Sequence, residues 1–420
     1  MKLVKAVIPL ILAASLLSGC SQVPQDMKNP GGNIKNEENR DMSNIGFSEF
    51  DDDLISYIAP TIDGENYMIS PLSFRYAMAL ATAGATGEAK EELLKAMGFS
   101  SLEEYTKWTN EINDIVIKFD ESLQRDIRDS KEYGYGEKAP DRALKVANSI
   151  WHNTNKEGKI KDSYIEYVKN NYNATAENVA QNELVDKINN WVKEQTNGLI
   201  PSLVTDQVEE SNTVLVNTLY MKSSWTKTFD EHSTKEDDFT TIGGGKVKKE
   251  FMHQTDSFAY AEGKDYQLVI LPMEGNIKMA IVIGNNENIS DKLAKTTYED
   301  VIVDLPKFEV ETSYDKKELI NYLTNKGVVA ALDSQGHGAF EDMIDGADLY
   351  IDDIIQKTKI KVDENGTEAA AATAIMMFDT TAMMEPKVPK EFKADRPFSY
   401  YIYTDSNNGQ ELLFFGEVVQ

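Results

Sequence analysis

The side chains that most often carry out chemistry in proteins are few in this chain and form no catalytic pattern. None of the four histidines belongs to an H-E-x-x-H zinc helix or shares a motif with a second metal ligand. The chain has no G-x-S-x-G nucleophile elbow, and Gly84-Ala85-Thr86-Gly87 lacks the Lys-Ser or Lys-Thr pair of a phosphate loop. We therefore expect no metal, no other cofactor and no enzymatic activity.

The single cysteine, Cys20, is expected to carry lipid. It follows Leu17-Ser18-Gly19, which resembles the bacterial lipobox, and the basic start and apolar run of residues 1–19 are typical of a signal peptide. An ordinary secretion signal with an incidental cysteine is the alternative. The apolar run is too short to span a bilayer comfortably, and one cysteine excludes an intramolecular disulfide.

The chain is expected to have three parts, namely the signal peptide, a flexible tether over residues 20–45 and one large domain over residues 46–420. The tether is rich in Pro, Gly, Asn and charged residues. We expect the domain to be held by its lipid anchor at a membrane, on the extracytoplasmic or extracellular face of the cell envelope. The formal net charge of −27 argues against a nucleic-acid partner, because binding phosphate requires clustered Lys and Arg.

Helical patterns dominate the first half of the domain and strand patterns the second, which predicts an α+β fold. A strong helix start is Ser70-Pro71, a hydroxyl cap followed by proline at the first helical position. Asn407-Asn408-Gly409 predicts a hairpin between the last two strands. Helices are expected over residues 47–59, 71–83, 88–97, 102–128, 163–172, 184–196 and 315–326. Strands are expected over residues 213–221, 266–272, 278–283, 301–311, 399–404 and 412–419, with Pro306 marking an edge or bulge.

One stretch, VDENGTEAAAATAIMMFDTTAMMEPK (residues 362–387), fits neither kind of element well. Its alanines favour a helix, but no apolar stripe of helical period runs through them. As a strand it lacks β-branched and aromatic residues. This pattern is consistent with a segment that must adopt two different conformations.

Many segments of the domain resemble the serpin family, in serpin order and with serpin spacing across residues 46–420. These segments are NYMISPLSFRYAMALATAGATGEAKEELLKAMGF, LKVANSIW, INNWVKEQTNGLIPSLV, VLVNTLYMKSSWTKTFD, VDLPKFEVE, VDENGTEAAAATA, DRPFSYYIY and ELLFFGEVV. The resemblance implies a fold of about nine helices and three β-sheets with an exposed reactive-centre loop. It also implies a monomeric suicide inhibitor of serine or cysteine proteases, whose loop is cleaved and then inserts into the main sheet, trapping the protease covalently.

The resemblance identifies the unusual stretch as the hinge of that loop. In a strand, Thr367, Ala369, Ala371 and Thr373 share one face, which would turn inward on insertion. Their small size would let them enter a packed interior. The hinge implied by the family consists of Glu364, Gly366, Thr367, Glu368, Ala369, Ala370, Ala371, Ala372 and Thr373.

The resemblance also implies two groups of residues that control how the sheet opens. Glu364 should pair with Lys307 near the top of the insertion gap, where Trp225 should also lie. Ser70, Ser73 and Asn217 match polar positions beneath the point where the strands part. Gln356 stands where serpins usually carry histidine, which implies altered kinetics and less pH sensitivity.

Serpin spacing places the cleaved bond between Thr380 and Thr381. The loop up to Pro397 is longer than in many relatives, so Phe378, Met383 and Met384 remain rival cleavage points. Threonine favours proteases with small pockets, of elastase or subtilisin type, whereas Phe or Met favours chymotrypsin-like or cathepsin-like enzymes. The alternative function is that of a non-inhibitory serpin with a binding or structural role in the envelope. An envelope hydrolase is a further alternative, although no nucleophile motif supports it.

Overall fold

The computed structural model describes residues 46–62, 64–133, 142–314, 317–335, 338–351, 354–367, 388–407 and 409–420. All of these residues belong to one compact unit. The hinge from Glu368 onward, the cleavage points and Cys20 lie outside these ranges.

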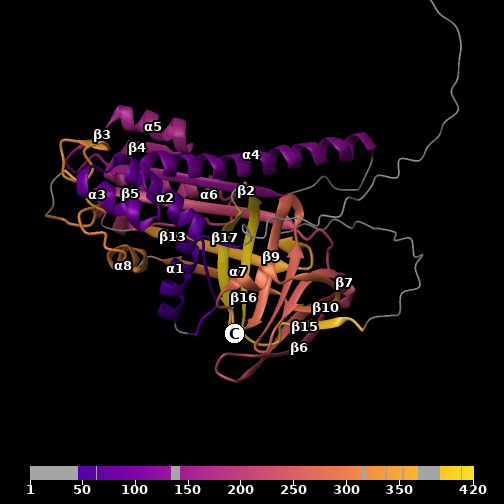
Figure 1. The fold of residues 1–420 in the computed structure, drawn as a ribbon. Coiled ribbons are helices and arrows are strands. Elements are labelled where there is room, and N and C mark those ends of the chain that lie inside the picture. The colour runs from indigo at the N-terminus through magenta and orange to yellow at the C-terminus, as the bar shows by residue number, and fades with distance from the viewer. Residues whose placement is uncertain are drawn as a thin grey trace, which may run out of the picture. The chain divides into compact units, whose positions relative to one another are not determined.

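Eight α-helices form within the described part of the chain (Figure 1); seven match the helical patterns of the sequence, and the short helix α7 was not predicted. They are α1 (Glu49–Ile58), α2 (Pro71–Gly84), α3 (Gly87–Ala96), α4 (Leu102–Tyr133), α5 (Asp162–Tyr172), α6 (Leu184–Gln195), α7 (Ile289–Ala294) and α8 (Glu318–Asn325). Helix α4 is longer than expected, and α8 begins later than expected. None of these helices has the length and apolar character needed to cross a membrane.

The strands build three sheets, which confirms the predicted α+β class. The six-stranded sheet has the order β11 (Phe308–Tyr314), β13 (Ile355–Asp363), β14 (Gly366–Thr367), β5 (Thr213–Ser224), β2 (Ala143–Asn153), β4 (Thr175–Val179). A two-stranded sheet pairs β12 (Ile344–Asp345) with β3 (Lys159–Ile160).

The nine-stranded sheet contains most of the second half of the chain. Its order is β1 (Tyr67–Ile69), β17 (Gly409–Val418), β16 (Phe398–Ser406), β9 (Ile277–Gly284), β8 (Tyr266–Pro272), β7 (Lys246–Glu262), β10 (Thr297–Pro306), β15 (Lys390–Lys393), with β6 (Lys235–Thr240) also paired to β7. The predicted hairpin near the C-terminus is confirmed, since β16 and β17 pair up to Ser406 and Gly409.

The prediction of a single strand over residues 301–311 is wrong. The chain leaves the nine-stranded sheet at Pro306, passes through Lys307 and enters the six-stranded sheet at Phe308. The backbone N–H of Lys307 still donates to the carbonyl oxygen of Glu250 on β7 at 2.8 Å, so the chain remains bonded to the first sheet up to the residue at which it crosses. Pro306 therefore marks a crossing between two sheets and not the edge or bulge that we expected.

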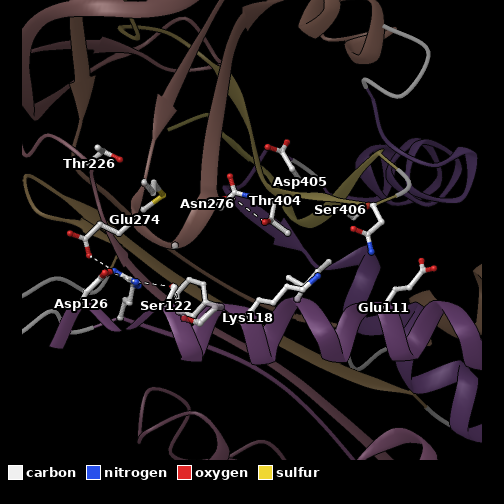
Figure 2. Close-up of a pocket in the computed structure, with 16 residues that line it drawn as sticks. Glu111, Lys118, Ser122, Asp126, Thr226, Glu274, Asn276, Thr404, Asp405 and Ser406 are labelled. Atoms are coloured by element: carbon white, nitrogen blue, oxygen red, sulfur yellow. Dashed lines mark hydrogen bonds and ion pairs between the residues drawn. The ribbon is translucent and has the colours of Figure 1, made fainter. Parts of the chain in front are cut away.

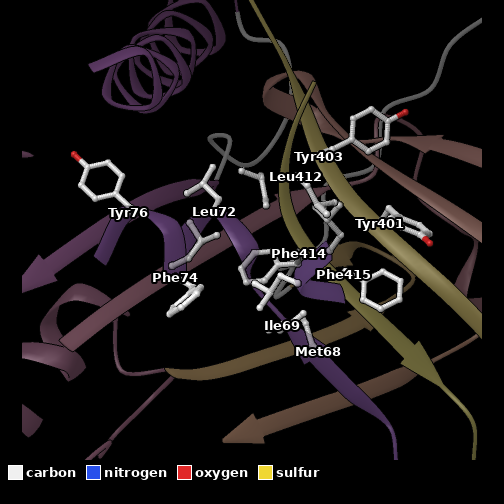
Figure 3. Packing of buried hydrophobic residues seen from close by; sticks show 14 of the residues in the cluster. Met68, Ile69, Leu72, Phe74, Tyr76, Tyr401, Tyr403, Leu412, Phe414 and Phe415 are labelled. Atoms are coloured by element: carbon white, nitrogen blue, oxygen red, sulfur yellow. The ribbon is translucent and has the colours of Figure 1, made fainter. Parts of the chain in front are cut away.

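Helix α2 lies at the centre of the core, and every one of its residues is buried. It contacts both β5 of the six-stranded sheet and β17 of the nine-stranded sheet. Figure 3 shows side chains of β1, α2, β16 and β17 meeting in this core. Ser70 caps the helix, because its side chain accepts the N–H of Ser73. The predicted cap thus anchors the element on which both large sheets pack.

Helix α6 covers the opposite face of the six-stranded sheet through a separate apolar cluster. Trp151, Val214 and Val216 of the sheet pack there against Leu184, Ile188 and Val192 of the helix. Both faces of the sheet are therefore covered by protein where this cluster lies. Any strand added to this part of the sheet enters a largely buried environment.

Candidate functional site

The start of the predicted hinge forms a strand of its own, β14, between β13 and β5. It is antiparallel to both neighbours. Gly366 stands opposite Asp363 of β13 and Ser224 of β5, and Thr367 stands opposite Val362 and Ser223. The sheet thus holds the first residues of a strand at one end of the space between β13 and β5.

The same two strands meet directly at the other end. Ile355 and Gln356 of β13 pair in parallel with Val216 and Asn217 of β5. A strand that continued from Thr367 would have to separate this pair to pass. The space between the two strands is therefore open to a strand at one end and closed at the other.

Gly366 occupies a position that only glycine can fill. Its φ of +136° lies in a region that residues with a side chain rarely adopt. A Cβ atom there would lie 2.3 Å from the carbonyl oxygen of Ser223 and 2.6 Å from Cα of Ser224. The absence of a side chain lets the hinge approach the backbone of β5 closely.

Thr367 is almost fully buried, with 1% of its surface exposed. Its Oγ1 accepts the backbone N–H of Ser223 at 3.1 Å and donates to the carbonyl oxygen of Ser223 at 3.2 Å. The Ser223 hydroxyl in turn donates to the carbonyl oxygen of Glu274 at 2.9 Å. Ser223 lies in a segment that resembles serpins, but its role was not predicted, because it depends on the pairing of β14 with β5.

Glu364 and Lys307 lie together, as the resemblance implied. Lys307 Nζ is 3.4 Å from Glu364 Oε1 and 3.3 Å from Glu250 Oε2. The Thr234 hydroxyl donates to Glu364 Oε1 at 2.8 Å. Burial by itself would raise the pKa of Glu364, but its own backbone N–H, Thr234 and Lys307 together hold the pKa below its ordinary value. Glu364 is therefore held in its charged form.

Trp225 lies beside the turn that joins β13 to the hinge. Its indole Nε1 donates to the carbonyl oxygen of Asp363 at 2.9 Å, and its backbone N–H donates to the carbonyl oxygen of Asn365 at 2.9 Å. Only 2% of the residue is exposed. These bonds fix the position from which the hinge enters the sheet.

Gln356 holds the closed end of the gap through hydrogen bonds to the start of α2. Its Oε1 accepts the backbone N–H of Ser70 at 3.1 Å, and its Nε2 donates to the carbonyl oxygen of Ser70 at 3.0 Å. The Ser70 hydroxyl donates to the carbonyl oxygen of Leu413 at 2.7 Å. An amide can donate and accept at once without changing charge, so this connection involves no titrating group.

Asn217 faces Gln356 across the strand pair and is only partly satisfied. Its Nδ2 donates to Oδ1 of Asn148 on β2. Its Oδ1 is buried and has no hydrogen-bond partner among the described residues. An unpartnered buried acceptor is costly, so the closed end would gain from a donor that arrived between the strands. Asn148 was not foreseen, since its role depends on the pairing of β2 with β5.

The remaining predicted site residues are not described by the structure. They are the rest of the hinge (Glu368, Ala369, Ala370, Ala371, Ala372 and Thr373), the cleavage points (Phe378, Thr380, Thr381, Met383 and Met384) and the lipid-attachment residue Cys20. Among the described residues, no group of three or more His, Cys, Asp or Glu side chains could hold a metal ion.

Comparison with known proteins gives a consistent result. Residues 47–420 match the model of the family described as Serpin (serine protease inhibitor). An uncharacterized serpin-like protein, TK1782 of Thermococcus kodakarensis, is 30% identical over 377 residues, covering 85% of this chain and 81% of that protein. The leukocyte elastase inhibitor of Xenopus tropicalis is 29% identical over 377 residues, covering 84% and 92%.

Solved structures share the fold. Serpin48 of the insect Tenebrio molitor, described as a highly specific serpin, superimposes with a TM-score of 0.69 at 27% identity, covering 88% of this chain and 96% of that chain. A thyroxine-binding globulin in complex with thyroxine reaches a TM-score of 0.70 at 19% identity, covering 88% and 97%. The second likeness concerns the fold alone.

Proposed function

The chain belongs to the serpin family, and from that premise we propose that it inhibits serine or cysteine proteases by trapping them covalently with its own cleaved loop. The observation that carries the proposal is the position of β14, since the first hinge residues, Gly366 and Thr367, lie between β13 and β5. The leukocyte elastase inhibitor and an antichymotrypsin of Bombyx mori are among the relatives. An inhibitor of this kind needs a loop that can continue into the sheet.

The register of β14 determines where each further hinge residue would land. Continued by two residues, it brings Ala369 between Ile360 and Met221, both of which are buried. A further two residues bring Ala371 between Thr358 and Leu219, which are also buried. Alanine adds little volume there, so these positions admit a strand with little overpacking.

The same register brings Thr373 to the closed end of the gap, between Gln356 and Asn217. A threonine hydroxyl can donate one hydrogen bond, and the buried Oδ1 of Asn217 needs a donor. Insertion past this point would therefore replace the direct pairing of β13 with β5 and would bring a hydrogen-bond donor, the Thr373 hydroxyl, to Asn217 Oδ1.

The outward-facing hinge positions are also compatible with insertion. Glu368 would stand opposite Lys361 of β13 and Lys222 of β5. Lys361 is half exposed, so the opposite charges would meet at the surface of the sheet, where a carboxylate stays hydrated. The one charged residue of the hinge after Glu364 would thus face two basic side chains.

Insertion would release a large free energy. Each ladder hydrogen bond contributes roughly 1 kcal/mol net, so about a dozen bonds give on the order of 10 kcal/mol, comparable with the stability of a whole domain. The state with only Gly366 and Thr367 in the sheet is therefore metastable and persists for kinetic reasons.

Cleavage couples this free energy to the protease. The catalytic hydroxyl or thiol of the protease attacks the carbonyl carbon of Thr380, and the bond to Thr381 breaks as its nitrogen takes the proton. Thr380 is left as an ester or thioester on the enzyme. Full extension of the chain from Thr367 to Thr380 covers about 40 Å, so insertion would carry the acylated protease away before water completes hydrolysis. Phe378, Met383 and Met384 remain the alternative cleavage points.

The test is to incubate the full-length chain with subtilisin, elastase, chymotrypsin and a cysteine protease. Denaturing gels and intact-mass analysis would then reveal covalent complexes, and the released C-terminal peptide identifies the cleaved bond. We expect a complex that survives denaturant with at least one enzyme. Cleavage of the loop by every protease without any complex would contradict trapping and favour a non-inhibitory serpin.

The proposal also includes a location at the outer side of a membrane, held through lipid on Cys20. The support is the lipobox-like Leu17-Ser18-Gly19-Cys20 and the signal-like residues 1–19. Labelling cells with a radioactive fatty acid should mark the wild-type chain but not Cys20→Ala, which should also leave the membrane fraction. A variant that stays equally membrane-bound would refute the lipid anchor without touching the inhibitory proposal.

A further inference from the structure

A small cavity lies at the closed end of the gap between β5 and β13, on the side of the sheet that α6 covers. Its volume is about 280 Å³. The apolar part of its lining consists of Leu203, Val204 and Val208 from the segment between α6 and β5, Val214 of β5 and Ile355 of β13. The same residues belong to, or pack against, the apolar cluster that α6 forms with the sheet. The cavity is therefore an extension of that cluster toward the gap.

Two asparagines hold the wall of this cavity in place. Asn189 on α6 accepts the backbone N–H groups of Leu203 at 2.7 Å and Val204 at 3.0 Å, and its Nδ2 donates to the carbonyl oxygen of Val204 at 3.0 Å. Asn153 at the end of β2 donates from Nδ2 to the carbonyl oxygen of Glu209 at 2.9 Å. Since β2 pairs with β5 along almost its whole length, the wall and β5 form one unit.

The other border of the cavity is β13, on the far side of the gap. Ile355 pairs directly with Val216 of β5 and is the lining residue that β13 contributes. A strand that enters here must move β13 away from β5 by one strand spacing, about 4.8 Å. The incoming strand therefore becomes the neighbour of the wall in place of Ile355.

The register of β14 identifies the side chains that would reach this wall. Alternate hinge residues, beginning with Glu368, face the side that α6 covers, because they stand level with Val216 and Val214, which pack against α6. Continued in register, Ala374 comes between Ile355 and Val216, and Met376 comes opposite Val214. Val214 lines the cavity, so Met376 is the side chain that arrives there.

The types of residue on this face suit that destination. Between Glu368 and Met376 the face carries only Ala370, Ala372 and Ala374, which add little volume beneath the covering helix. Methionine is unbranched and adapts to irregular apolar gaps. The volume of the cavity lies just below the roughly 300–1,000 Å³ of pockets that bind small molecules. A single apolar side chain is thus a better match than a free ligand.

A groove elsewhere in the molecule has the opposite character. Figure 2 shows this groove of about 620 Å³ between α4 and the turns of the nine-stranded sheet, lined mostly by charged and polar side chains. Arg142 there pairs with Asp126 and Glu274. It immediately precedes β2 and lies level with Thr367 at the open end of the gap. The later hinge residues lead away from this groove and toward the smaller cavity.

We propose that the cavity beside α6 is the binding site for the Met376 side chain once the loop has inserted. The inference rests on the proposed insertion and names the contact that fixes its far end. Burial of an apolar side chain is favourable, and this burial becomes available only after the strand has passed the Gln356–Asn217 pair. The contact therefore favours complete insertion over insertion that stops at the closed end, and it lies four residues before Thr380.

The test uses the cleaved full-length chain. Wild type, Met376→Ala and Val388→Ala are cut with the same protease, and the mass of the C-terminal peptide confirms a cleavage point after Met376. Unfolding rates are then recorded in concentrated guanidinium chloride. We expect cleaved Met376→Ala to unfold roughly tenfold faster than cleaved wild type, because it lacks an apolar contact that must break on unfolding. Before cleavage the two should unfold alike. Val388 lies beyond the candidate cleavage points and is 90% exposed, so Val388→Ala should match wild type.

A change of size on the wall distinguishes this cavity from burial elsewhere. Val208→Phe fills part of the cavity, so Met376 no longer fits and the cleaved variant should unfold faster than cleaved wild type. In Met376→Ala/Val208→Phe the ring takes the space that methionine left, and the cleaved double variant should unfold more slowly than either single variant. Additive effects of the two changes, or a wild-type unfolding rate in Met376→Ala, would overturn the proposal.

If Val208→Phe does not fold, Ser211→Leu narrows the same cavity from its polar rim and carries the same expectations. Failure of this inference is distinguishable from failure of trapping. Covalent complexes together with no effect of Met376→Ala would refute the contact alone. A cleaved wild type that gains stability without forming complexes would refute trapping, while the exchange of sizes still decides the contact. A cleaved wild type that gains no stability would refute insertion and the contact together.

Discussion

β13 meets β5 in two different ways at its two ends, and the two ends use different chemistry. Where the hinge enters, an ion pair between Glu364 and Lys307, a buried threonine and a glycine with positive φ hold the chain in place. Where the strands close, Gln356 and Asn217 pair directly and only neutral amide and hydroxyl groups take part. The end near Glu364 therefore admits a strand, whereas the end at Gln356 and Asn217 must separate before a strand can pass.

The resistance of the closed end is local. The residues that would line a longer inserted strand on its inner face are small or apolar, apart from the Gln356–Asn217 pair. A few strong contacts are enough to delay the proposed insertion, because each of them must break before the next ladder hydrogen bond can form. Changes at either end should therefore have separable effects on inhibition, on stability and on pH dependence.

The largest effect is expected at the open end, from Thr367→Arg. A guanidinium group in place of a side chain that is 1% exposed would leave a buried charge unpaired. The loop would be cleaved but would not insert, so the covalent complex should fall by at least tenfold in the gel assay. Ile242→Arg, at a position that is 62% exposed, is the control and should inhibit normally. Full inhibition by Thr367→Arg would exclude entry of the hinge at this point.

A change at the closed end should act on stability instead. Gln356→Ala leaves the buried N–H of Ser70 without its partner, whereas the Ser70 carbonyl keeps the N–H of Phe74, so the change should cost about 1–3 kcal/mol. Urea unfolding of the full chain measures the loss. Lys357→Ala, on the neighbouring residue that pairs with Glu311 at the surface, should cost much less. Equal losses in the two variants would mean that the bonds to Ser70 do not hold this end.

Introducing a titrating group at the closed end should make it depend on pH. In Gln356→His, a neutral imidazole could still accept the Ser70 N–H, whereas burial opposes its protonation and lowers its pKa in the folded state. The stabilising contribution is then present above the unfolded pKa of about 6.5 and is lost as the pH falls through the folded pKa. Melting temperatures between pH 8 and pH 5 should fall further for the variant than for wild type. Parallel curves would show that the position does not sense protonation.

The smallest effect is expected from Glu364 at the open end. Its pKa is held below the ordinary value of 4.5, so its contribution to stability is complete above that pH and is lost as the pH falls through the lowered value. Glu364→Gln should lower the melting temperature by less than about 2 °C at pH 7. The difference from wild type should shrink as the pH falls below 4.5. A difference that persists at low pH would assign the effect to the Thr234 hydrogen bond and not to charge.

Much of the fold followed from local signals. The Ser70-Pro71 cap, the helical stripes and the turn before Gly409 are properties of short segments, and the structure confirms them. The long strand β7 was not foreseen, because Lys246–Glu262 mixes charged and apolar residues without a clean alternation. The crossing at Lys307 was also missed, since a single proline does not reveal that the residues on its two sides belong to different sheets.

The residues of the site also fall into those that could be predicted and those that could not. Gly366, Glu364 and Lys307 could be placed only through resemblance to a family, because Lys307 lies far from Glu364 and Gly366 in the sequence and meets Glu364 only in the fold. The roles of Ser223, Thr234 and Asn148 were not predicted, although Ser223 and Asn148 lie in segments that resemble serpins. Each is an ordinary polar residue whose importance comes from the partner that another strand brings to it.

The pairing of β1 with β17 has a consequence for biosynthesis. Tyr67 and Ile69 lie opposite Glu417 and Phe415, so an early strand cannot pair until β17, about 350 residues later in the chain, has been made. Until then β9 and β1 each present an unpaired edge, which invites association with other chains. Contacts of such long sequence separation also form slowly. Completion of the core must therefore wait until β17 has been made, and removing β17 should yield insoluble protein.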